Sequence, residues 1–261
     1  MNLDLTHLKA ATYGYAFGRE IRSFREISST QDYAVSIAET DPYCHGLVIV
    51  SESQSSGHGR RGREWLSPQG GLWFSVITKS DIKSRSAIFL SYAMSLAVCE
   101  TMANKFNIEV SIKWPNDVLI KARKVAGVLL SSAIRGEGLE YCVIGVGINL
   151  NSRPRDLKGS TSLIEHIGQS SVAVEPFLAS ILVLFSNYYD EIESGNEELI
   201  TKRWKLRCPV IGKMVSAKVD GVRLDGIASD IDSDGLLTLV TKSGQKVKIS
   251  DTQESSIKIG S

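Results

Sequence analysis

The sequence lacks long apolar runs and lacks an excess of charge of either sign, and each absence excludes a class of protein. No apolar stretch among its 261 residues reaches the roughly 18 residues of a membrane-spanning helix. The first five residues, Met1 to Leu5, have neither the basic nor the apolar region of a secretory signal peptide. Thirty basic residues against 29 acidic ones give a formal net charge of +1, so no global field attracts nucleic acid or an anionic membrane. We therefore expect a soluble, cytoplasmic protein in which any basic site is local.

The sequence is also poor in cysteine, and its four cysteines form no C-x-x-C pair. Cys44, Cys99, Cys142 and Cys208 are far apart and lie mostly among apolar residues. This pattern predicts reduced core thiols of a cytosolic protein and argues against a disulfide framework. His58 stands alone in a glycine-rich stretch without a partner at metal-ligand spacing, so we expect no metal there.

Apolar segments with turn signals between them predict a body that mixes helices and strands. A capping box formed by Ser28 and Gln31 marks the start of the first helix. Ser29 and Thr30 are expected cap residues, and the free N–H groups of that helix could also bind a polar ligand. The expected helices cover residues 32–39, 87–106, 176–192 and 197–207, and the expected strands cover residues 46–51, 72–77, 110–114, 118–120, 124–133 and 141–150. Because only short turns separate the last four strands, we expect an antiparallel meander.

The pattern changes after residue 207, where short alternating segments are joined by tight turns. Asp220-Gly221 and Ser243-Gly244 are typical of hairpins. The expected strands cover residues 214–219, 222–229, 236–241 and 245–249. The sequence therefore predicts two domains, a main domain over residues 1–207 and a small β-barrel over residues 208–261.

One stretch, from Gln54 to Trp65, combines glycines with arginines. Three glycines let the backbone approach a ligand closely, and three arginines supply forked donors suited to phosphate or carboxylate. Trp65 adds a flat apolar face. The stretch predicts a mobile lid over an anionic, ring-bearing ligand. A solvated loop, or a nucleic-acid patch formed by Arg60, Arg61 and Arg63, remains the alternative at this point.

Residues 57–62 also match G-x-G-x-x-G, the dinucleotide fingerprint, after an expected strand. A true fingerprint opens a helix whose N-terminus holds the pyrophosphate. Pro68 and the glycines after it stop any helix here, so we interpret the match as accidental.

A second stretch places Lys113 and Lys124 on either side of the turn Pro115-Asn116-Asp117. A lysine in a strand commonly only extends along an edge towards solvent. Lys124, however, is followed by Gly127, and Gly145 lies in another expected strand. Glycines inside strands often mark the close approach of a ligand, which favours a functional role for Lys124.

Five ordered motifs together resemble the catalytic domain of biotin protein ligases. The family's pattern runs from Ser-Thr-Asn through Gln-x-x-Gly-Arg/His-Gly-Arg-x-x-Arg-x-Trp, Lys-Trp-Pro-Asn-Asp and Lys-x-x-Gly-Ile/Val-Leu to Gly-x-Gly-x-Asn. It is matched in order by Ser29-Thr30 and by residues 54–65, 113–117, 124–129 and 145–149. The resemblance implies an α+β fold, with a mixed, largely antiparallel sheet and helices as in class II synthetases, plus a small C-terminal SH3-like β-barrel. It also implies a monofunctional ligase without an N-terminal DNA-binding domain.

The resemblance further implies a two-step reaction that depends on ATP. Biotin and ATP give biotinyl-5′-AMP and pyrophosphate, and the adenylate then biotinylates a lysine of a biotin carboxyl carrier protein. Such an enzyme binds biotin, ATP and Mg²⁺, has no nucleic-acid or membrane partner, and is expected to be a homodimer. Because attack of a carboxylate on the α-phosphate brings two anions together, positive charge must be concentrated at the site.

The matched motifs imply a role for each of their main residues. Lys124 and Arg60 match catalytic residues that stabilise charge. The residues matched to the biotin pocket are Ser29, Thr30, Gln54, Gly57, His58, Arg60, Lys124, Gly127 and Gly145. Those matched to the ATP and adenylate site are Arg60, Arg63, Trp65, Lys124 and Asn149, and those expected near Mg²⁺ are Asn116 and Asp117.

Two places depart from the family's pattern, and two other functions stay open. Gln31 stands where asparagine is usual, and Leu130-Ser131 replaces Val-Glu.

The first alternative is a related lipoate-attaching enzyme, for which we would not expect the glycine-arginine loop together with Lys-Trp-Pro-Asn-Asp. The second is a nucleic-acid-binding protein that uses the basic loop at residues 57–63.

Overall fold

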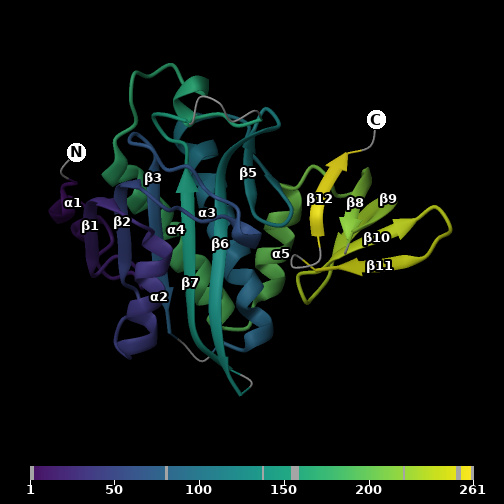
Figure 1. Ribbon diagram of the computed structural model, residues 1–261, viewed down its shortest axis with the longest axis horizontal. Coiled ribbons are helices and arrows are strands. Elements are labelled where there is room, and N and C mark those ends of the chain that lie inside the picture. The colour runs from purple at the N-terminus through teal and green to yellow at the C-terminus, as the bar shows by residue number, and fades with distance from the viewer. Residues whose placement is uncertain are drawn as a thin grey trace.

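A seven-stranded sheet forms the centre of the computed structural model, which describes residues 3–79, 82–136, 138–153, 159–219, 221–250 and 254–259. Only the first two strands in the sheet run parallel, and every other neighbouring pair is antiparallel. In spatial order the strands are β1 (Ile21–Ile27), β2 (Val48–Gln54), β3 (Leu72–Thr78), β7 (Gly138–Ile148), β6 (Arg123–Arg135), β5 (Asp117–Ile120) and β4 (Ser111–Lys113) (Figure 1). The expected mixed, largely antiparallel sheet and the meander at its end are confirmed.

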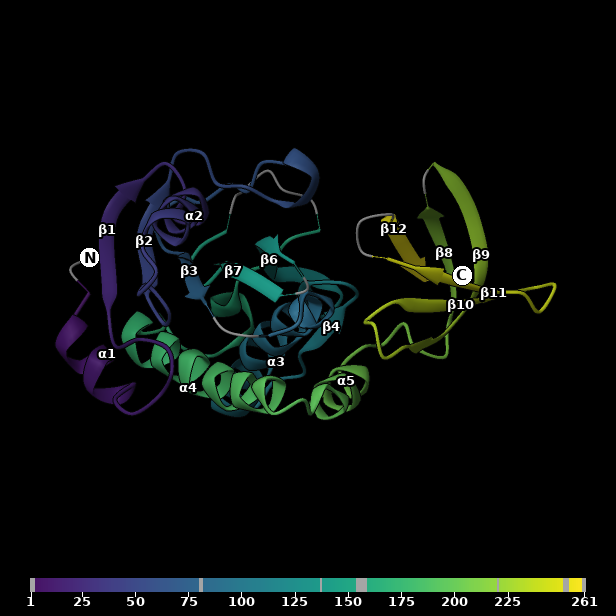
Figure 2. The same ribbon diagram turned by 90° about the horizontal axis from the view of Figure 1, so that it is seen from below.

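Helices cover the two faces of the sheet unequally (Figure 2). On one face α3 (Ala87–Phe106) packs against the meander strands, and α4 (Val174–Glu193) and α5 (Glu197–Leu206) pack against α3. The short α1 (Leu5–Ala11) packs on α4. On the other face α2 (Thr30–Thr40) lies against β2, β3 and β7. It does not cover the ends of β6 and β5 on that face.

Helix α3 is buried along most of its length, as its apolar composition predicts. By length and composition it could cross a membrane, but 89% of its most apolar window is buried inside the molecule. The four cysteines are also buried and free. Burial raises the pKa of the Cys99 and Cys142 thiols to about 12, so these groups stay protonated. The expectation of reduced core thiols is confirmed.

Helix α2 begins one residue later than the expected capping box requires. Ser29 has the extended backbone of an N-cap, and its hydroxyl accepts a hydrogen bond from the Asp32 amide at 3.2 Å. The capping box assigned to Ser28 and Gln31 is therefore wrong, because Gln31 is the second helical residue and its side chain points into the protein, where it is 6% exposed.

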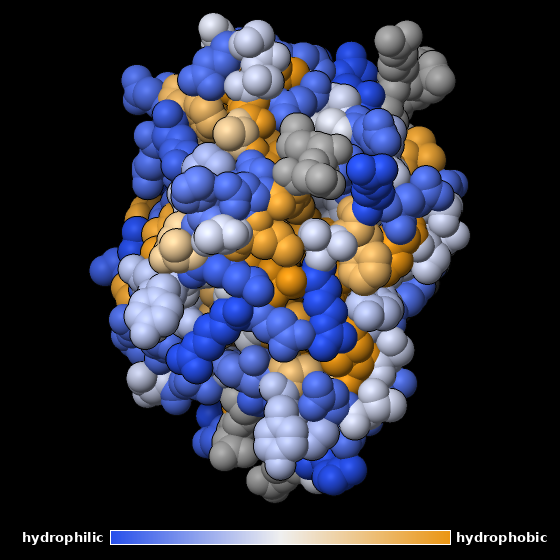
Figure 3. Space-filling view, turned by 90° about the vertical axis from the view of Figure 1, so that its left-hand side faces the viewer, coloured by the Kyte–Doolittle hydropathy of each residue, from blue (hydrophilic) through white to orange (hydrophobic). Residues whose placement is uncertain are grey.

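The edge strand β1 separates apolar from charged residues. Ile21 is buried and Phe24 is half-buried against Tyr33 of α2, whereas Arg25 and Glu26 are exposed. Figure 3 views the molecule from this side and shows apolar side chains gathered mid-face, bordered by hydrophilic ones. Charged side chains on an edge strand discourage pairing with other chains.

The C-terminal part of the chain forms a second sheet of five antiparallel strands, as expected for a β region there. In spatial order these are β11 (Lys246–Ile249), β10 (Leu237–Thr241), β9 (Val222–Ile231), β8 (Met214–Val219) and β12 (Glu254–Ile259). The strand β12 was not expected from the sequence. The division of the chain at residue 208 stays a prediction.

Candidate active site

A cavity of about 440 Å³ opens beside the N-terminus of α2, above β3, β7, β6 and β5. The loop at residues 54–65 and the turn at residues 115–117 close its other sides. All of the site residues predicted from the sequence line this cavity except Gly57 and Asn149. The fold thus brings together motifs that are far apart in the sequence.

One end of the cavity, here called the polar end, is built around Gln54. Its side-chain oxygen accepts hydrogen bonds from the Thr30 amide at 2.8 Å and the Thr30 hydroxyl at 3.1 Å. Its side-chain amide donates to the Ser67 hydroxyl at 2.7 Å. The Ser75 hydroxyl donates to the Thr30 hydroxyl at 2.9 Å. Gln54 therefore joins the start of α2 to the base of the loop.

Gln31 also belongs to the polar end, although the sequence marked it only as a departure from the family's pattern. Its side-chain amide donates to the Ser131 hydroxyl at 2.9 Å and to the Val143 carbonyl at 3.1 Å. Its oxygen accepts from the Ser75 hydroxyl at 3.1 Å. The two departures, Gln31 and Ser131, are therefore hydrogen-bonded to each other. A side chain at Gly145 would place a Cβ atom 2.3 Å from the Gln31 oxygen, so the glycine makes room for this glutamine.

An ion pair between two neighbouring strands lines the cavity. Lys124 Nζ lies 2.5 Å from Asp117 Oδ1, and the two side chains are 32% and 27% exposed. The register of β5 and β6 places Leu119 opposite Lys124 and Asp117 opposite Gly127, which brings the two charged side chains together. Lys113, on the edge strand β4, also lines the cavity.

The loop contacts the turn across the cavity. Arg60 Nη1 donates to Asn116 Oδ1 at 3.4 Å, and the Asn116 amide donates to the Val128 carbonyl. On the other side, His58 Nε2 lies 2.7 Å from Asp32 Oδ2 of α2. The loop is therefore held at both sides of the cavity mouth.

Within itself the loop folds back as a tight hairpin. The Trp65 amide donates to the Gly57 carbonyl at 2.8 Å, and the Gly59 amide to the Arg63 carbonyl at 2.6 Å. A Cβ atom at Gly57 would lie 2.4 Å from the Trp65 carbonyl oxygen, so this glycine serves the hairpin and does not line the cavity. The motif contains a 3₁₀ turn, Arg60–Gly62, and no helix follows it before β3. No dinucleotide-binding helix opens here, as expected.

Trp65 lies over the strand glycines and over Lys124. Lys124 Nζ is 4.7 Å from the centre of the Trp65 ring, a cation–π distance. Cβ atoms at Gly147 and Gly127 would come within 2.4 and 3.2 Å of the Trp65 ring. The indole Nε1 is buried and has no hydrogen-bond partner. The strand glycines thus mark a close approach, and Trp65 is the group that approaches.

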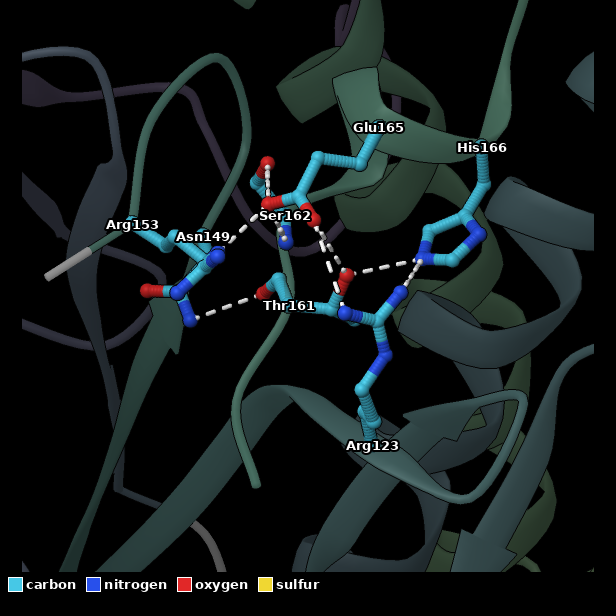
Figure 4. A network of polar contacts seen from close by, with 7 residues as sticks. All are labelled: Arg123, Asn149, Arg153, Thr161, Ser162, Glu165 and His166. Carbon is cyan, nitrogen blue, oxygen red and sulfur yellow. Dashed lines mark hydrogen bonds and ion pairs between the residues drawn. The ribbon is translucent and has the colours of Figure 1, made fainter. Parts of the chain in front are cut away.

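Asn149 stands just beyond the end of β7 and does not line the cavity. It is 2% exposed, and its side-chain amide donates to the Thr161 carbonyl at 3.0 Å (Figure 4). Its backbone amide donates to the Val125 carbonyl at 2.8 Å. In this structure Asn149 holds a neighbouring segment in place, and its role towards a nucleotide stays a prediction.

The described residues contain no group of three or more histidine, cysteine or carboxylate side chains that could hold a metal ion. Asn116 and Asp117 nevertheless offer oxygen atoms to the cavity. Mg²⁺ is commonly bound by one or two carboxylates together with substrate phosphates. The donor set therefore fits an ion that arrives with a nucleotide, and it does not fit an all-protein metal centre.

Comparisons with known proteins all find one family of ligases. The model of the biotin/lipoate A/B protein ligase family matches residues 23–149. A biotin–[acetyl-CoA-carboxylase] ligase of Paracoccus denitrificans is 30% identical over 206 residues, 76% of this chain and 86% of that protein. A bifunctional ligase/repressor of Bacillus subtilis is 30% identical over 226 residues, 84% of this chain and 69% of that protein. The structure of a biotin protein ligase from Aquifex aeolicus in complex with biotin and ATP matches with a TM-score of 0.79 and 25% identity, over 93% of this chain and 100% of that one.

Proposed function

The chain belongs to the biotin protein ligase family, and we propose that its cavity is where this ATP-dependent biotin–[acetyl-CoA-carboxylase] ligase activates biotin and transfers it to protein. In the first half-reaction a biotin carboxylate oxygen attacks the α-phosphorus of ATP. An acyl-phosphate bond forms, and the bond to the leaving pyrophosphate breaks. In the second, the amine of a carrier lysine attacks the acyl carbon, loses a proton and displaces AMP.

The position of Lys124 is the single observation on which this proposal depends. Its ammonium group lines the cavity, next to Asp117 and near the ring of Trp65, in the loop that also carries Arg60. A carboxylate and an α-phosphate that meet there repel each other, and a cation fixed between them stabilises the charge that develops in the transition state. Asp117 would hold Lys124 in place before the substrates enter. Arg60 would add a second cation from the loop.

The polar end suits the ureido ring of biotin. That ring presents two N–H donors and a carbonyl acceptor, and the hydroxyl and amide groups of Thr30, Gln54 and Ser75 can satisfy both kinds. The dithiolane ring of lipoate has no N–H and no carbonyl, so it would gain no hydrogen bonds there. The polar end therefore favours biotin over lipoate within the matched family.

Trp65, with Arg60 and Arg63, is proposed to cover the adenylate. All three line the cavity from the loop side. A loop closed over a mixed anhydride keeps water from hydrolysing it. The contact of Arg60 with Asn116 argues against the alternative of a basic loop spread out for nucleic acid.

Mg²⁺, the protein partner and the assembly belong to the proposal as well. Asp117 and Asn116 would hold Mg²⁺ together with the phosphates of ATP, and the ion would neutralise phosphate charge. The acceptor would be a lysine of a biotin carboxyl carrier protein. The resemblance supports a homodimer, and the buried, free thiols support a cytoplasmic location.

Incubation with ATP, Mg²⁺ and either biotin or lipoate tests the function. We expect biotin-dependent pyrophosphate release and a bound biotinyl-5′-AMP, and neither product with lipoate. Turnover with lipoate but not with biotin would show that lipoate is the substrate. Steeply salt-dependent binding of nucleic acid without turnover would favour the other alternative.

A further inference from the structure

The backbone of Lys124 is hydrogen-bonded to a segment that comes much later in the chain. The pairing of β6 with β7 ends at Ala126 and Ile148. Beyond that point Gly159 to Thr161 run alongside β6 in the parallel direction, with Ser160 opposite Lys124. The Lys124 amide donates to the Gly159 carbonyl, and the Thr161 amide donates to the Lys124 carbonyl, both at 2.9 Å. Both backbone polar groups of Lys124 are therefore bonded to this segment.

The carboxylate of Glu165 holds that segment in place (Figure 4). Oε1 accepts from the Ser162 amide at 3.2 Å and from the Ser162 hydroxyl at 2.9 Å. Oε2 accepts from the Thr161 hydroxyl at 3.3 Å. These bonds fix residues 161 and 162, and so fix the part of the segment that is bonded to Lys124.

Two arginines meet the same carboxylate from different directions. Arg153 Nε lies 2.6 Å from Oε1, and Arg123 Nη1 lies 3.6 Å from Oε2. Arg123 is the immediate neighbour of Lys124 in β6. Partial burial alone would raise the pKa of the Glu165 carboxyl, but the bonds from Ser162 and Arg153 hold this pKa below its ordinary value. Glu165 therefore stays charged and connects both chain segments that flank Lys124.

We infer that Glu165 is a positioning residue for Lys124, which it fixes through the 159–162 segment and through Arg123. The inference rests on the proposed role of Lys124. Glu165 lies outside the cavity lining, so it acts on the reaction only through the place that it gives to the Lys124 side chain. Without its negative charge Arg123 and Arg153 would repel each other, and β6 would shift relative to the segment.

The test is Glu165→Gln, read by single-turnover formation of biotinyl-5′-AMP and by the Kd of biotin. We expect the rate to fall roughly ten-fold, since small displacements of a catalytic group have effects of this order or more. The Kd of biotin should stay within about two-fold, because Thr30, Gln54 and Ser75 of the polar end lie on α2, β2 and β3. The matched control is Glu140→Gln, which removes the ion pair between Glu140 of β7 and Arg135 of β6 (2.8 Å). This pair lies at the opposite end of β6 from Lys124. We expect no change in the control.

A double mutant separates positioning from general stability. In a Lys124→Ala background Glu165→Gln should cost nothing further, because the side chain that it positions is gone. An equal, additive loss in both backgrounds would overturn the inference. If Glu165→Gln does not fold, Arg123→Gln removes the contact between β6 and Glu165 instead. This variant must then show the same fall in the adenylation rate, and no further fall in the Lys124→Ala background. If the unaltered protein forms no biotinyl-5′-AMP from biotin, the proposed function is overturned together with the inference. If the unaltered protein forms it and Glu165→Gln forms it at the same rate, only the inference is overturned.

Discussion

Lys124 and Asp117 show how strand register places charged groups in the lining of the cavity. Their 2.5 Å contact needs β5 and β6 to pair as they do, with Asp117 opposite Gly127. If β6 slipped by one residue, Lys124 would point to the other face of the sheet. The position of one cation thus depends on the pairing of the whole strand.

Lys124→Ala should reduce biotin adenylation by on the order of 10²–10³, the usual effect of losing a group that stabilises the transition state. Biotin-dependent exchange of pyrophosphate into ATP measures this rate. Lys105→Ala, a change at an exposed residue near the end of α3, is the control and should exchange normally. Near-normal exchange in Lys124→Ala would contradict the proposed role.

Gly145→Ala should weaken the binding of biotin roughly ten-fold, the cost of about one lost hydrogen bond. The new Cβ atom would lie 2.3 Å from the Gln31 oxygen and would displace that side chain from Ser75 and Ser131. Isothermal titration with biotin measures the Kd. A Cβ atom at Gly168 would meet nothing within 4 Å, so Gly168→Ala is the matched control. Equal biotin affinity in both variants would show that Gln31 does not shape the polar end.

Single residues were predictable from the sequence where a motif gathers them. The loop arginines and Lys124 stand in dense local patterns, and the fold places them in one cavity. The contact between Gln31 and Ser131 was not predictable, because 100 residues separate them and only the packing of α2 on β3 and β7, next to β6, brings them together. Local sequence also could not tell that Gly147 faces Trp65.

At the scale of elements, the loop at residues 54–65 acts as a hairpin anchored at its tip and at its side. Its tip reaches the turn through Arg60 and Asn116, and its side reaches α2 through His58 and Asp32. Both side-chain contacts involve exposed or half-buried groups, which contribute little to stability on their own. We therefore expect the loop to open and close at low cost.

Arg60→Gly should speed the release of biotinyl-5′-AMP roughly 10- to 100-fold, since a hydrogen bond to a charged group contributes about 1.5–3 kcal/mol. The change removes the link to Asn116 and a cation that faces the cavity. The dissociation rate of the adenylate, followed by stopped flow, is the measurement. Arg135→Gly, at the exposed end of β6, should leave this rate unchanged. Equal off-rates for Arg60→Gly and the unaltered protein would rule out a lid that depends on Arg60.

Long apolar segments were predictable as elements, and elements defined by long-range pairing were not. Residues 87–106 form α3 over the full expected range, because the segment is apolar on most faces. The strand β12 pairs with β8, which lies far before it in the sequence, and so gave no local hairpin signal. The start of α2 was displaced by one residue, because several neighbouring polar residues can all serve as a cap.

At the scale of the whole molecule, one tyrosine connects the second sheet with the cavity. Tyr92 of α3 donates its hydroxyl to the Gly235 carbonyl at 2.7 Å and accepts from Trp114 Nε1 at 2.8 Å. Its ring stacks on Trp204 of α5, with 4.8 Å between ring centres. Trp114 precedes the turn that carries Asn116 and lines the cavity. The hydroxyl of Tyr92 thus joins the C-terminal sheet, the core helix and the wall of the site.

Tyr92→Phe should therefore lower the free energy of unfolding by about 1–3 kcal/mol, because it takes a partner from a buried indole N–H and from a carbonyl while keeping the stacked ring. Urea denaturation followed by tryptophan fluorescence measures the change, and the midpoint should fall. Tyr43→Phe is the control, because Tyr43 is 91% exposed and its hydroxyl can bond to water. If the second sheet contributes to the site through this link, Tyr92→Phe should also slow adenylation under conditions in which the protein stays folded. A lowered midpoint with unchanged adenylation would show that the Tyr92 hydroxyl contributes to stability but not to the reaction. An unchanged midpoint would show that the hydroxyl does not couple the two sheets.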